Sequence, residues 1–328
     1  MSLFEGMLVN AGVLVVALLL LDKFSHWTIV NSERVADLTG FGKTAVGFLL
    51  VAMSTSLPEL SVAVFSTRTQ EAVGIAVGNV LGSNIVNVCL VFGVCILYAA
   101  WKNLDCLDFL PLITRQDIKS LQLGLFAASI IPLTLIYIGY ASRLIGVVLL
   151  LVFVWNTVQI IRSQEGVKDE GALGEEAGKL PRYMGLAVFG SLGVIASSYF
   201  IVESATYIAL ELGLSKLVIG ATIVAFGTSL PELATSLEAT KSGNISMALG
   251  NIVGSGMLNL TLILGTTLVL TDLTVDMSVF TNLAVFSLIS NLFLWYFLSG
   301  DRICWREGAV LAALYVVFLA STLRGQTL

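Results

Sequence analysis

The sequence predicts an all-α membrane protein with ten transmembrane helices, arranged as two inverted five-helix repeats. Three observations lead to this prediction. The chain is 57% hydrophobic and only 12% charged, with a mean hydropathy of +0.94, which is typical of multi-span membrane proteins and not of soluble domains. Apolar runs of about 20 residues, the length that crosses a bilayer, recur along the chain. Two short motifs also occur once in each half.

Ten apolar segments are long enough to cross the membrane. We expect helices at residues 3–22, 43–68, 72–98, 119–138, 142–162, 183–208, 215–240, 245–270, 277–298 and 304–323. The second, third, seventh and eighth are rich in Gly, Ser, Thr and Asn, which favours tightly packed interior helices. The fourth, fifth, ninth and tenth are plainer Leu, Val and Phe runs and are predicted to form a lipid-facing scaffold. The first has no basic region ahead of it, so we interpret it as a retained helix and not a signal peptide.

A polar, glycine-containing linker at residues 163–182 divides the chain. Such a stretch cannot bury enough apolar surface to fold alone. It separates a first five-helix repeat, residues 1–162, from a second, residues 183–328. Because five is odd, two halves that fold alike must cross the bilayer in opposite directions, which defines an inverted-topology repeat.

The positions of Lys and Arg predict the orientation in the cell (plasma) membrane. Of the 17 Lys and Arg residues, all but Arg68, Arg143, Lys216 and Arg324 follow odd-numbered helices. On the positive-inside rule, this places residues 163–182 in the cytoplasm and both termini outside. No basic patch interleaved with aromatic residues indicates binding to nucleic acid, and no obligate protein partner is expected beyond the lipid bilayer.

Four cysteines occur without any CxxC pair. Cys89 and Cys95 lie in an apolar segment and are expected to fill the core. The single histidine, His26, follows the first apolar run and is expected at the membrane interface.

One repeated motif places an acid beside a proline inside an apolar segment. Residues 55–60 read Thr-Ser-Leu-Pro-Glu-Leu, and the same text returns at 228–233. A charge in lipid is costly, so Glu59 and Glu232 are functional candidates by default. Proline lacks an N–H group and frees the carbonyl four residues earlier, at Ser54 and Gly227. Two broken helices with two acids predict a cation site shared by the halves.

A second repeated motif supplies neutral oxygens. Gly-Asn-x-x-Gly-Ser occurs at 78–83 and 250–255, and its glycines allow neighbouring backbones to approach closely. Polar residues then recur every four positions, at Asn79, Ser83 and Asn87 and at Asn251, Ser255 and Asn259. Thr55 and Glu59, like Thr228 and Glu232, are also four apart and would stack on a helix. Carboxylate, hydroxyl and carbonyl oxygens are the hard ligands that Ca²⁺ and Na⁺ require.

Simpler interpretations exist for each feature taken alone. A Gly/Ser/Asn stripe usually serves helix packing, and a single proline in a membrane helix is commonly a kink. Glu71 and Glu238 lie near predicted helix ends and are expected to meet water. Each half, however, combines an acid, a proline and a polar stripe. The occurrence of this combination in both halves favours an ion site.

Residues 47–93 and 220–265 resemble the two α-repeats of the cation/Ca²⁺ exchanger superfamily, in particular the prokaryotic sodium/calcium exchangers. The resemblance rests on Gly-Thr-Ser-Leu-Pro-Glu-Leu at 227–233 and on the two Gly-Asn-x-x-Gly-Ser motifs. It implies a diamond of four ion sites and a secondary active antiporter that exchanges Na⁺ for Ca²⁺ by alternating access. The first and sixth helices would slide against the rest. The ions are transported substrates, and the resemblance implies neither a cofactor nor an enzyme.

The resemblance also implies roles for individual residues. Glu59 and Glu232 match the calcium-coordinating glutamates. The other matched positions are Thr55 and Thr228 as carbonyl donors to Ca²⁺, Ala52 and Ala225 as carbonyl donors to Na⁺, Ser56, Ser229, Ser83 and Ser255 as sodium-site hydroxyls, and Asn87 and Asn259 as residues flanking the central site.

Departures from the family pattern leave alternatives open. Ser54 stands where the second half has Gly227, and Gly256 stands at the position equivalent to Asn84. Some relatives, including the potassium-dependent branch, carry aspartate where this chain has Asn259, which weakens K⁺-dependent Na⁺/Ca²⁺ exchange. The H⁺/Ca²⁺ branch usually lacks the Thr-Ser-Leu-Pro-Glu text. A cation channel using the same oxygens is the alternative from a different class. The absence of GxSxG, HExxH and an Asp dyad disfavours an intramembrane hydrolase.

Overall fold

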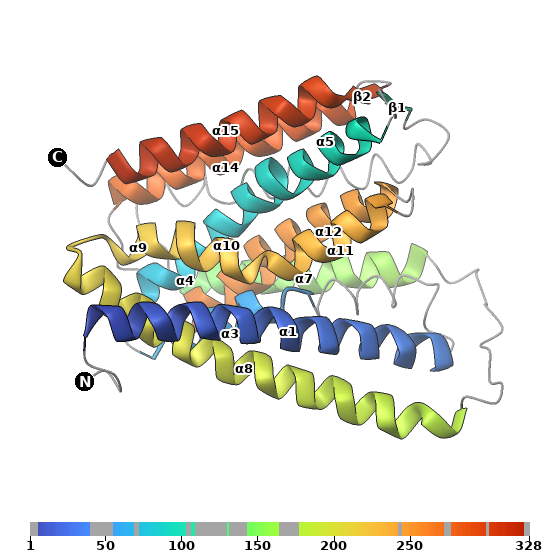
Figure 1. The fold of residues 1–328 in the computed structure, drawn as a ribbon, viewed down its shortest axis with the longest axis horizontal. Coiled ribbons are helices and arrows are strands. Elements are labelled where there is room, and N and C mark those ends of the chain that lie inside the picture. Colours follow the sequence, from blue (N-terminus) through green and yellow to red (C-terminus); the bar gives the residue numbers. More distant parts are fainter. Residues whose placement is uncertain are drawn as a thin grey trace.

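The computed structural model describes residues 6–39, 55–68, 72–102, 106–108, 130, 143–163, 177–241, 245–271, 277–299 and 302–324. These residues form a bundle of long helices (Figure 1). The predicted fourth helix, residues 119–138, lies outside this part of the chain except for residue 130. Residues 43–54 of the predicted second helix, with Ala52 and Ser54, also lie outside it.

The first half contains one helix that is longer than the sequence predicts. Its elements are α1 (Met7–Thr39), α3 (Leu57–Ser66), α4 (Val73–Ile85), the π-helical segment η2 (Val86–Phe92), α5 (Gly93–Trp101) and α7 (Arg143–Ser163). The predicted end of the first helix at residue 22 is wrong, because α1 continues to Thr39. No glycine or proline occurs between residue 12 and Gly40, so no helix breaker stops α1 where its apolar run ends.

The second half matches the predicted segments closely. Its elements are η3 (Ala177–Lys179), α8 (Leu180–Glu211), α9 (Lys216–Ile219), η4 (Gly220–Val224), α10 (Ala225–Thr228), α11 (Leu230–Lys241), α12 (Ile245–Leu258), η5 (Asn259–Ile263), α13 (Leu264–Leu270), α14 (Met277–Leu298) and α15 (Trp305–Arg324). Helix α8 begins three residues before the predicted start, with Pro181 in its first turn, a position that proline favours.

The described helices confirm a helical membrane protein with several apolar spans. Six are long and apolar enough to cross a bilayer, or up to seven if the bent pair 216–228 and 230–241 is one span. The α4–α5 and α12–α13 spans are interior, with 83% and 72% of their apolar windows buried. The windows of α1, α8, α14 and α15 are only 22%, 33%, 39% and 28% buried. Helices α1 and α8 lie side by side on one flank, and α14 and α15 on the opposite flank (Figure 1).

Glycines allow the interior helices to cross with their backbones in contact. A Cβ atom on Gly78 would overlap the carbonyl oxygen of Leu217, and one on Gly82 would overlap that of Ala221. Gly220 faces the carbonyl of Ile75 in the same way. The third predicted span carries the Gly-Asn-x-x-Gly-Ser motif of the first half, and the seventh carries the Thr-Ser-Leu-Pro-Glu-Leu motif of the second half. These two spans are therefore held at the closest distance that two helices permit.

A short strand pair links the chain after the last residue of α5 to the chain before the first residue of α15. Strand β1 (Cys106–Asp108) pairs antiparallel with β2 (Arg302–Cys304), and the register places Cys106 opposite Cys304. Cys304 is disulfide-bonded, and its N–H group donates to the Glu307 Oε2 atom at 2.7 Å, capping α15. Cys89 and Cys95 are free and buried, which confirms their predicted place in the core.

The close crossing predicts that Gly82→Ala lowers the melting temperature of the purified protein. The added methyl group meets backbone atoms of Ala221, which no rotamer change can relieve. We expect a cost of about 1–3 kcal/mol, as for other overpacked sites, measured by thermal unfolding in detergent.

Gly185→Ala is the matched control, because nothing lies within 4 Å of a Cβ atom there. Replacing a helical glycine at an open position stabilises by roughly 0.5–1 kcal/mol. Equal melting temperatures for the two variants would contradict the proposed packing.

Candidate cation site at the helix breaks

Both copies of the Thr-Ser-Leu-Pro-Glu-Leu motif break the helix at the same serine. Ser56 has φ −85° and ψ 4°, and Ser229 has φ −86° and ψ 5°. The amide of Leu60 donates to the Ser56 carbonyl at 3.1 Å, and that of Leu233 to the Ser229 carbonyl at 3.0 Å. In the second copy the axis bends by 43°. Since proline offers no N–H group to the preceding turn, each helix restarts directly after the serine, with its acid in the first turn.

The two acids are buried together. Glu59 and Glu232 are both 0% exposed, and their carboxyl groups are close enough to interact electrostatically. Thr228 lies beside Glu59, and Thr55 lies beside Glu232. Each glutamate therefore meets the threonine of the other half. In the described part of the chain no three His, Cys, Asp or Glu side chains gather as a metal cluster.

Neutral oxygens from both halves surround the acids. The Ser255 hydroxyl donates to Glu232 Oε1 at 3.3 Å and lies 3.2 Å from the Ser56 hydroxyl. The Asn87 amide donates to the same Ser255 oxygen at 3.2 Å. Since Ser56 and Asn87 belong to the first half and Ser255 to the second, these contacts join the repeats.

A similar set of contacts joins Ser83 and Asn79 of the first half to Thr228 of the second half. The Thr228 hydroxyl donates to Asn79 Oδ1 at 3.0 Å and lies 3.4 Å from the Ser83 hydroxyl. Asn79, Ser83 and Thr228 are each 0% exposed. The first polar stripe therefore faces the broken helix of the second half.

Several polar atoms of this cluster have no hydrogen-bond partner within the described chain. They are both carboxylate oxygens of Glu59, Oε2 of Glu232, Oδ1 of Asn87, both amide atoms of Asn259, Nδ2 of Asn79 and the Ser229 hydroxyl. Buried polar atoms are normally paired, and an unpaired one costs about 1–3 kcal/mol. Most of these atoms are oxygens, which is the donor set that suits a hard cation.

The two asparagines that the resemblance assigns to the flanks of the site sit where the helix widens. Asn87 lies in η2 and Asn259 begins η5, and both segments are π-helical. Each asparagine is 0% exposed. π-helical turns often occur at functional sites because the extra residue per turn redirects side chains. Nothing in the sequence pattern predicted this widening.

One predicted site residue, Ala225, and one residue of the second polar stripe, Asn251, have local bonding of their own. The Ala225 carbonyl accepts from the Ser229 amide at 3.1 Å and from the Thr228 hydroxyl at 3.3 Å. The Asn251 amide donates to the hydroxyls of Thr235 and Ser236, each at 3.0 Å. Asn251 therefore holds α12 against α11. The equivalent residue of the first half, Asn79, instead contacts Thr228, the threonine that lies beside Glu59.

Helix α14 carries a buried polar face that the sequence analysis missed. It was predicted as plain scaffold, but Ser287, Ser290 and Asn291 are at most 1% exposed. The Asn84 amide donates to the Ser287 hydroxyl at 2.6 Å, and a Cβ atom on Gly256 would lie 2.8 Å from Asn84 Oδ1. The spacing of three and four residues on one helix face was the available signal. Because Gly256 has no side chain, there is room beside it for the amide of Asn84, the equivalent residue of the first half.

Two buried carboxyl groups at helix breaks inside an apolar helical bundle are typical of membrane proteins that carry a functional site within the membrane. The comparisons specify the class further. The sequence profile described as "sodium/calcium exchanger protein" matches residues 9–161 and 182–324. The chain belongs to this family, which confirms the resemblance found in the motifs.

Several characterised and uncharacterised proteins are similar over nearly the whole chain. The sodium/calcium exchanger MaX1 of Methanosarcina acetivorans is 30% identical, covering 95% of this chain and 97% of its own. An uncharacterised membrane protein of Methanocaldococcus jannaschii is 31% identical, covering 97% and 100%.

Solved exchanger structures share the fold. The sodium-calcium exchanger NCX_Mj, soaked with 10 mM Na⁺ and zero Ca²⁺, has a TM-score of 0.65 and 29% identity, covering 96% of this chain and 99% of that one. The H⁺/Ca²⁺ exchanger CAX has a TM-score of 0.76, covering 98% and 88%, at 15% identity. The latter likeness concerns the fold alone.

The bonds of Asn251 predict a measurable coupling between α12 and α11. In a double-mutant cycle, Asn251→Ala and Ser236→Ala should show an interaction energy of about 1 kcal/mol in thermal or denaturant unfolding.

Thr240→Ala provides the control for this cycle. Its hydroxyl donates to the Ser236 carbonyl within α11 at 2.8 Å and not to the Ser236 hydroxyl that Asn251 contacts, so its coupling to Asn251→Ala should be clearly smaller than that of Ser236→Ala. A zero coupling between Asn251 and Ser236 would show that these bonds do not hold the two helices.

Proposed function

We propose that this chain is a secondary active antiporter that exchanges Na⁺ for Ca²⁺ across the membrane by alternating access. The observation that carries the proposal is the meeting of Glu59 and Glu232, one from each half, at 0% exposure among hydroxyl groups of both halves. Family membership and the full-length similarity to named sodium/calcium exchangers support the same activity.

The proposed ligands follow from donor chemistry and the family match. Ca²⁺ would be held by the carboxylates of Glu59 and Glu232 and by the backbone carbonyls of Thr55 and Thr228. Na⁺ would bind the remaining oxygens, from Ser56, Ser229, Ser83, Ser255, Ala52 and Ala225, with Asn87 and Asn259 flanking the centre. All are hard oxygen donors, which Ca²⁺ and Na⁺ prefer.

The charge of the site favours exchange over one-way transport. Two ionised carboxylates in a low-dielectric interior repel each other and have lost their hydration, so the empty charged site is unfavourable. One Ca²⁺ or a set of Na⁺ ions removes this penalty. The conformational change that carries the site across the membrane is therefore favoured only with ions bound. Because both ions use the same glutamates, each displaces the other.

This proposal predicts that Glu59→Gln and Glu232→Gln each abolish Na⁺-driven uptake of radiolabelled Ca²⁺ into proteoliposomes. Each change removes one of only two charges that balance the ion, and the lost interaction should lower uptake at least about tenfold.

Glu238→Gln is the matched control on the same helix as Glu232, because the Glu238 side chain is 71% exposed. It should transport at the wild-type rate. Undiminished uptake by both glutamine variants at the helix breaks would refute the proposed site.

The same vesicles separate the alternative activities. Uptake that requires an outward-directed Na⁺ gradient supports Na⁺/Ca²⁺ exchange. Uptake that follows a pH gradient and ignores Na⁺ would indicate H⁺/Ca²⁺ antiport, and a requirement for K⁺ would indicate the potassium-dependent reaction. Flux without any counter-ion would indicate a channel.

We also propose the ten-helix inverted repeat, with residues 1–162 and 183–328 as the halves. The equal backbone angles at Ser56 and Ser229 support it. So does the contact between Asn84 and Gly256, which are equivalent in sequence, because equivalent residues touch only near a symmetry axis. The start of α1 and the end of α15 lie at one end of the molecule, and the β1–β2 pair and the end of α7 at the other (Figure 1).

The orientation with both termini outside and residues 163–182 in the cytoplasm is tested by thiol labelling. Glu170→Cys should react with an impermeant maleimide only after the membrane of intact cells is opened, and Gln326→Cys should react without opening it. The unsubstituted chain, labelled in parallel, is the blank that measures the reaction of its own four cysteines, of which Cys89 and Cys95 are buried and Cys304 is already oxidised.

The reverse labelling pattern would overturn this orientation. It would also place the oxidised Cys304 outside the cell, where disulfides are common, whereas the proposed orientation places it on the reducing side.

A further inference from the structure

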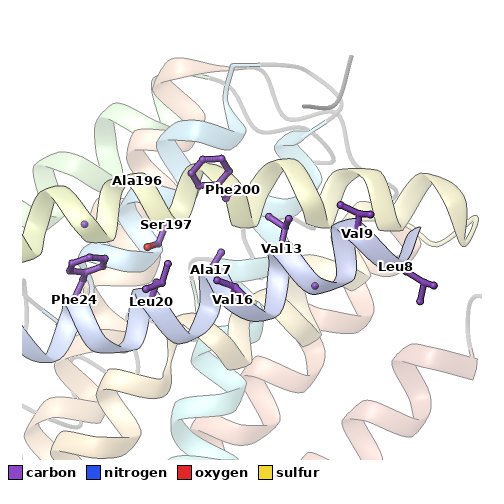
Figure 2. Close-up of a pocket in the computed structure, with 12 residues that line it drawn as sticks. Leu8, Val9, Val13, Val16, Ala17, Leu20, Phe24, Ala196, Ser197 and Phe200 are labelled. Carbon is purple, nitrogen blue, oxygen red and sulfur yellow. The ribbon is translucent and has the colours of Figure 1, made fainter. Parts of the chain in front are cut away.

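An open groove of about 550 Å³ runs between α1 and α8 on the flank of the molecule (Figure 2). Its walls are apolar along their length, with Val9, Val13, Val16 and Leu20 on α1 and with Ala196 and Phe200 on α8. Ser197 contributes the one hydroxyl group to the lining and is 5% exposed.

The groove is closed at one end by an aromatic cluster. Phe24 packs over Gly193, where a Cβ atom would overlap its ring. The Phe24 ring also meets Phe189 and Trp27 edge-on, with centroids 5.9 Å and 6.0 Å apart. This tight crossing holds the two helices together at Phe24. Towards Val9 nothing lies within 4 Å of a Cβ atom on Gly12, so the groove there is unfilled.

The groove lies at membrane depth. Residues 7–31 of α1 and 180–211 of α8 are both apolar spans. From Val9 to Phe24 the groove extends over about 22 Å of helix at 1.5 Å per residue, within the hydrocarbon thickness of about 30 Å. It is continuous with the exposed apolar surface of the same helices, where Leu19, Val188 and Leu192 are 64%, 60% and 59% exposed. The occupant must therefore be apolar and must arrive from the bilayer.

We propose that this groove binds one acyl chain of a membrane phospholipid, lying along α1 and α8 from Val9 to Phe24. A volume of about 550 Å³ spread over this length is narrow, which fits a flexible chain. A second transmembrane helix, about 10 Å across, needs a wider seat.

Charge supports the same occupant at the closed end. Lys23 is exposed beside Phe24, with its ammonium group 5.8 Å from the centre of the Trp27 ring. Lysine and tryptophan together mark the headgroup level of a bilayer, and the positive charge attracts a lipid phosphate.

An acyl chain in this position would also bear on the proposed transport cycle. The Leu18 side chain of α1 packs against Gly227, where a Cβ atom would overlap it, next to Thr228 in the ion site. A chain that fills the groove would therefore lie against the same helix that makes this contact. This consequence rests on the proposed antiport activity, whereas binding of the chain does not.

The test is photolabelling in vesicles of phosphatidylglycerol that carries a diazirine near the end of one acyl chain. Peptides containing the groove faces, residues 8–24 and 193–200, should be labelled several-fold more than lipid-exposed peptides of α14 and α15, which carry Tyr296 and Val316 at 75% and 64% exposure.

Gly12→Leu should reduce the groove labelling about tenfold, because its side chain takes the space of roughly two methylene groups of the lipid. Gly185→Leu is the matched control, because it too is an open position on one of the two helices but lies outside the groove. If Gly12→Leu fails to fold, Ala196→Leu fills the groove from α8.

Equal labelling of all lipid-exposed helices, or unchanged groove labelling in the filled variants, would overturn the proposal. Protein–protein cross-links through α1 and α8 would show that a second copy occupies the groove and would also overturn it. Labelling needs no ion gradient, so its result is independent of whether the chain exchanges Na⁺ for Ca²⁺.

Discussion

The burial of two like-charged carboxyl groups in a low-dielectric interior is the constraint on which the rest of this structure depends. Glu59 and Glu232 are inaccessible to water and close to each other, which is unfavourable unless a cation or protons compensate. The surrounding features reduce this cost. The breaks at Ser56 and Ser229 place each acid in the first turn of a new helix, hydroxyls and amides are turned inwards, and glycines bring the helices close enough to enclose the site.

The contacts around the acids make the site a property of both halves. Thr228 lies beside Glu59 and Thr55 beside Glu232, so the polar surroundings of each acid include residues of both halves. A conformational change that separated the halves would dismantle the site. Movement that preserves it must therefore take place elsewhere, between the motif helices as a unit and the helices around them.

The distribution of burial is consistent with such a division. The spans that carry the Gly-Asn-x-x-Gly-Ser motifs are mostly buried, whereas α1 and α8 pack mainly on each other and leave wide apolar faces exposed. An open groove runs along one face of this helix pair, whereas Leu14 and Leu21 of α1 are packed with Ile201 and Ala205 of α8 in a buried cluster.

The sequence by itself determined the family and the positions of most of the described helices, and it singled out the two acids. Duplicated motifs in apolar segments identified the family, and the cost of charge in a membrane singled out Glu59 and Glu232 without coordinates. Proline fixed the helix breaks, because its missing N–H group acts locally. The length of α1 was misjudged, because hydropathy marks the apolar part of a helix and not the point where the helix ends.

Only the tertiary structure decided which oxygens meet. It paired each glutamate with the opposite threonine, turned Asn251 towards Ser236 while Asn79 meets Thr228, and gave α14 a polar face against Asn84. The physical reason is that sequence periodicity places residues on a helix face, whereas partners depend on the crossing and rotation of whole helices. These are set by close backbone approaches at glycines and by π-helical turns, which no local pattern records.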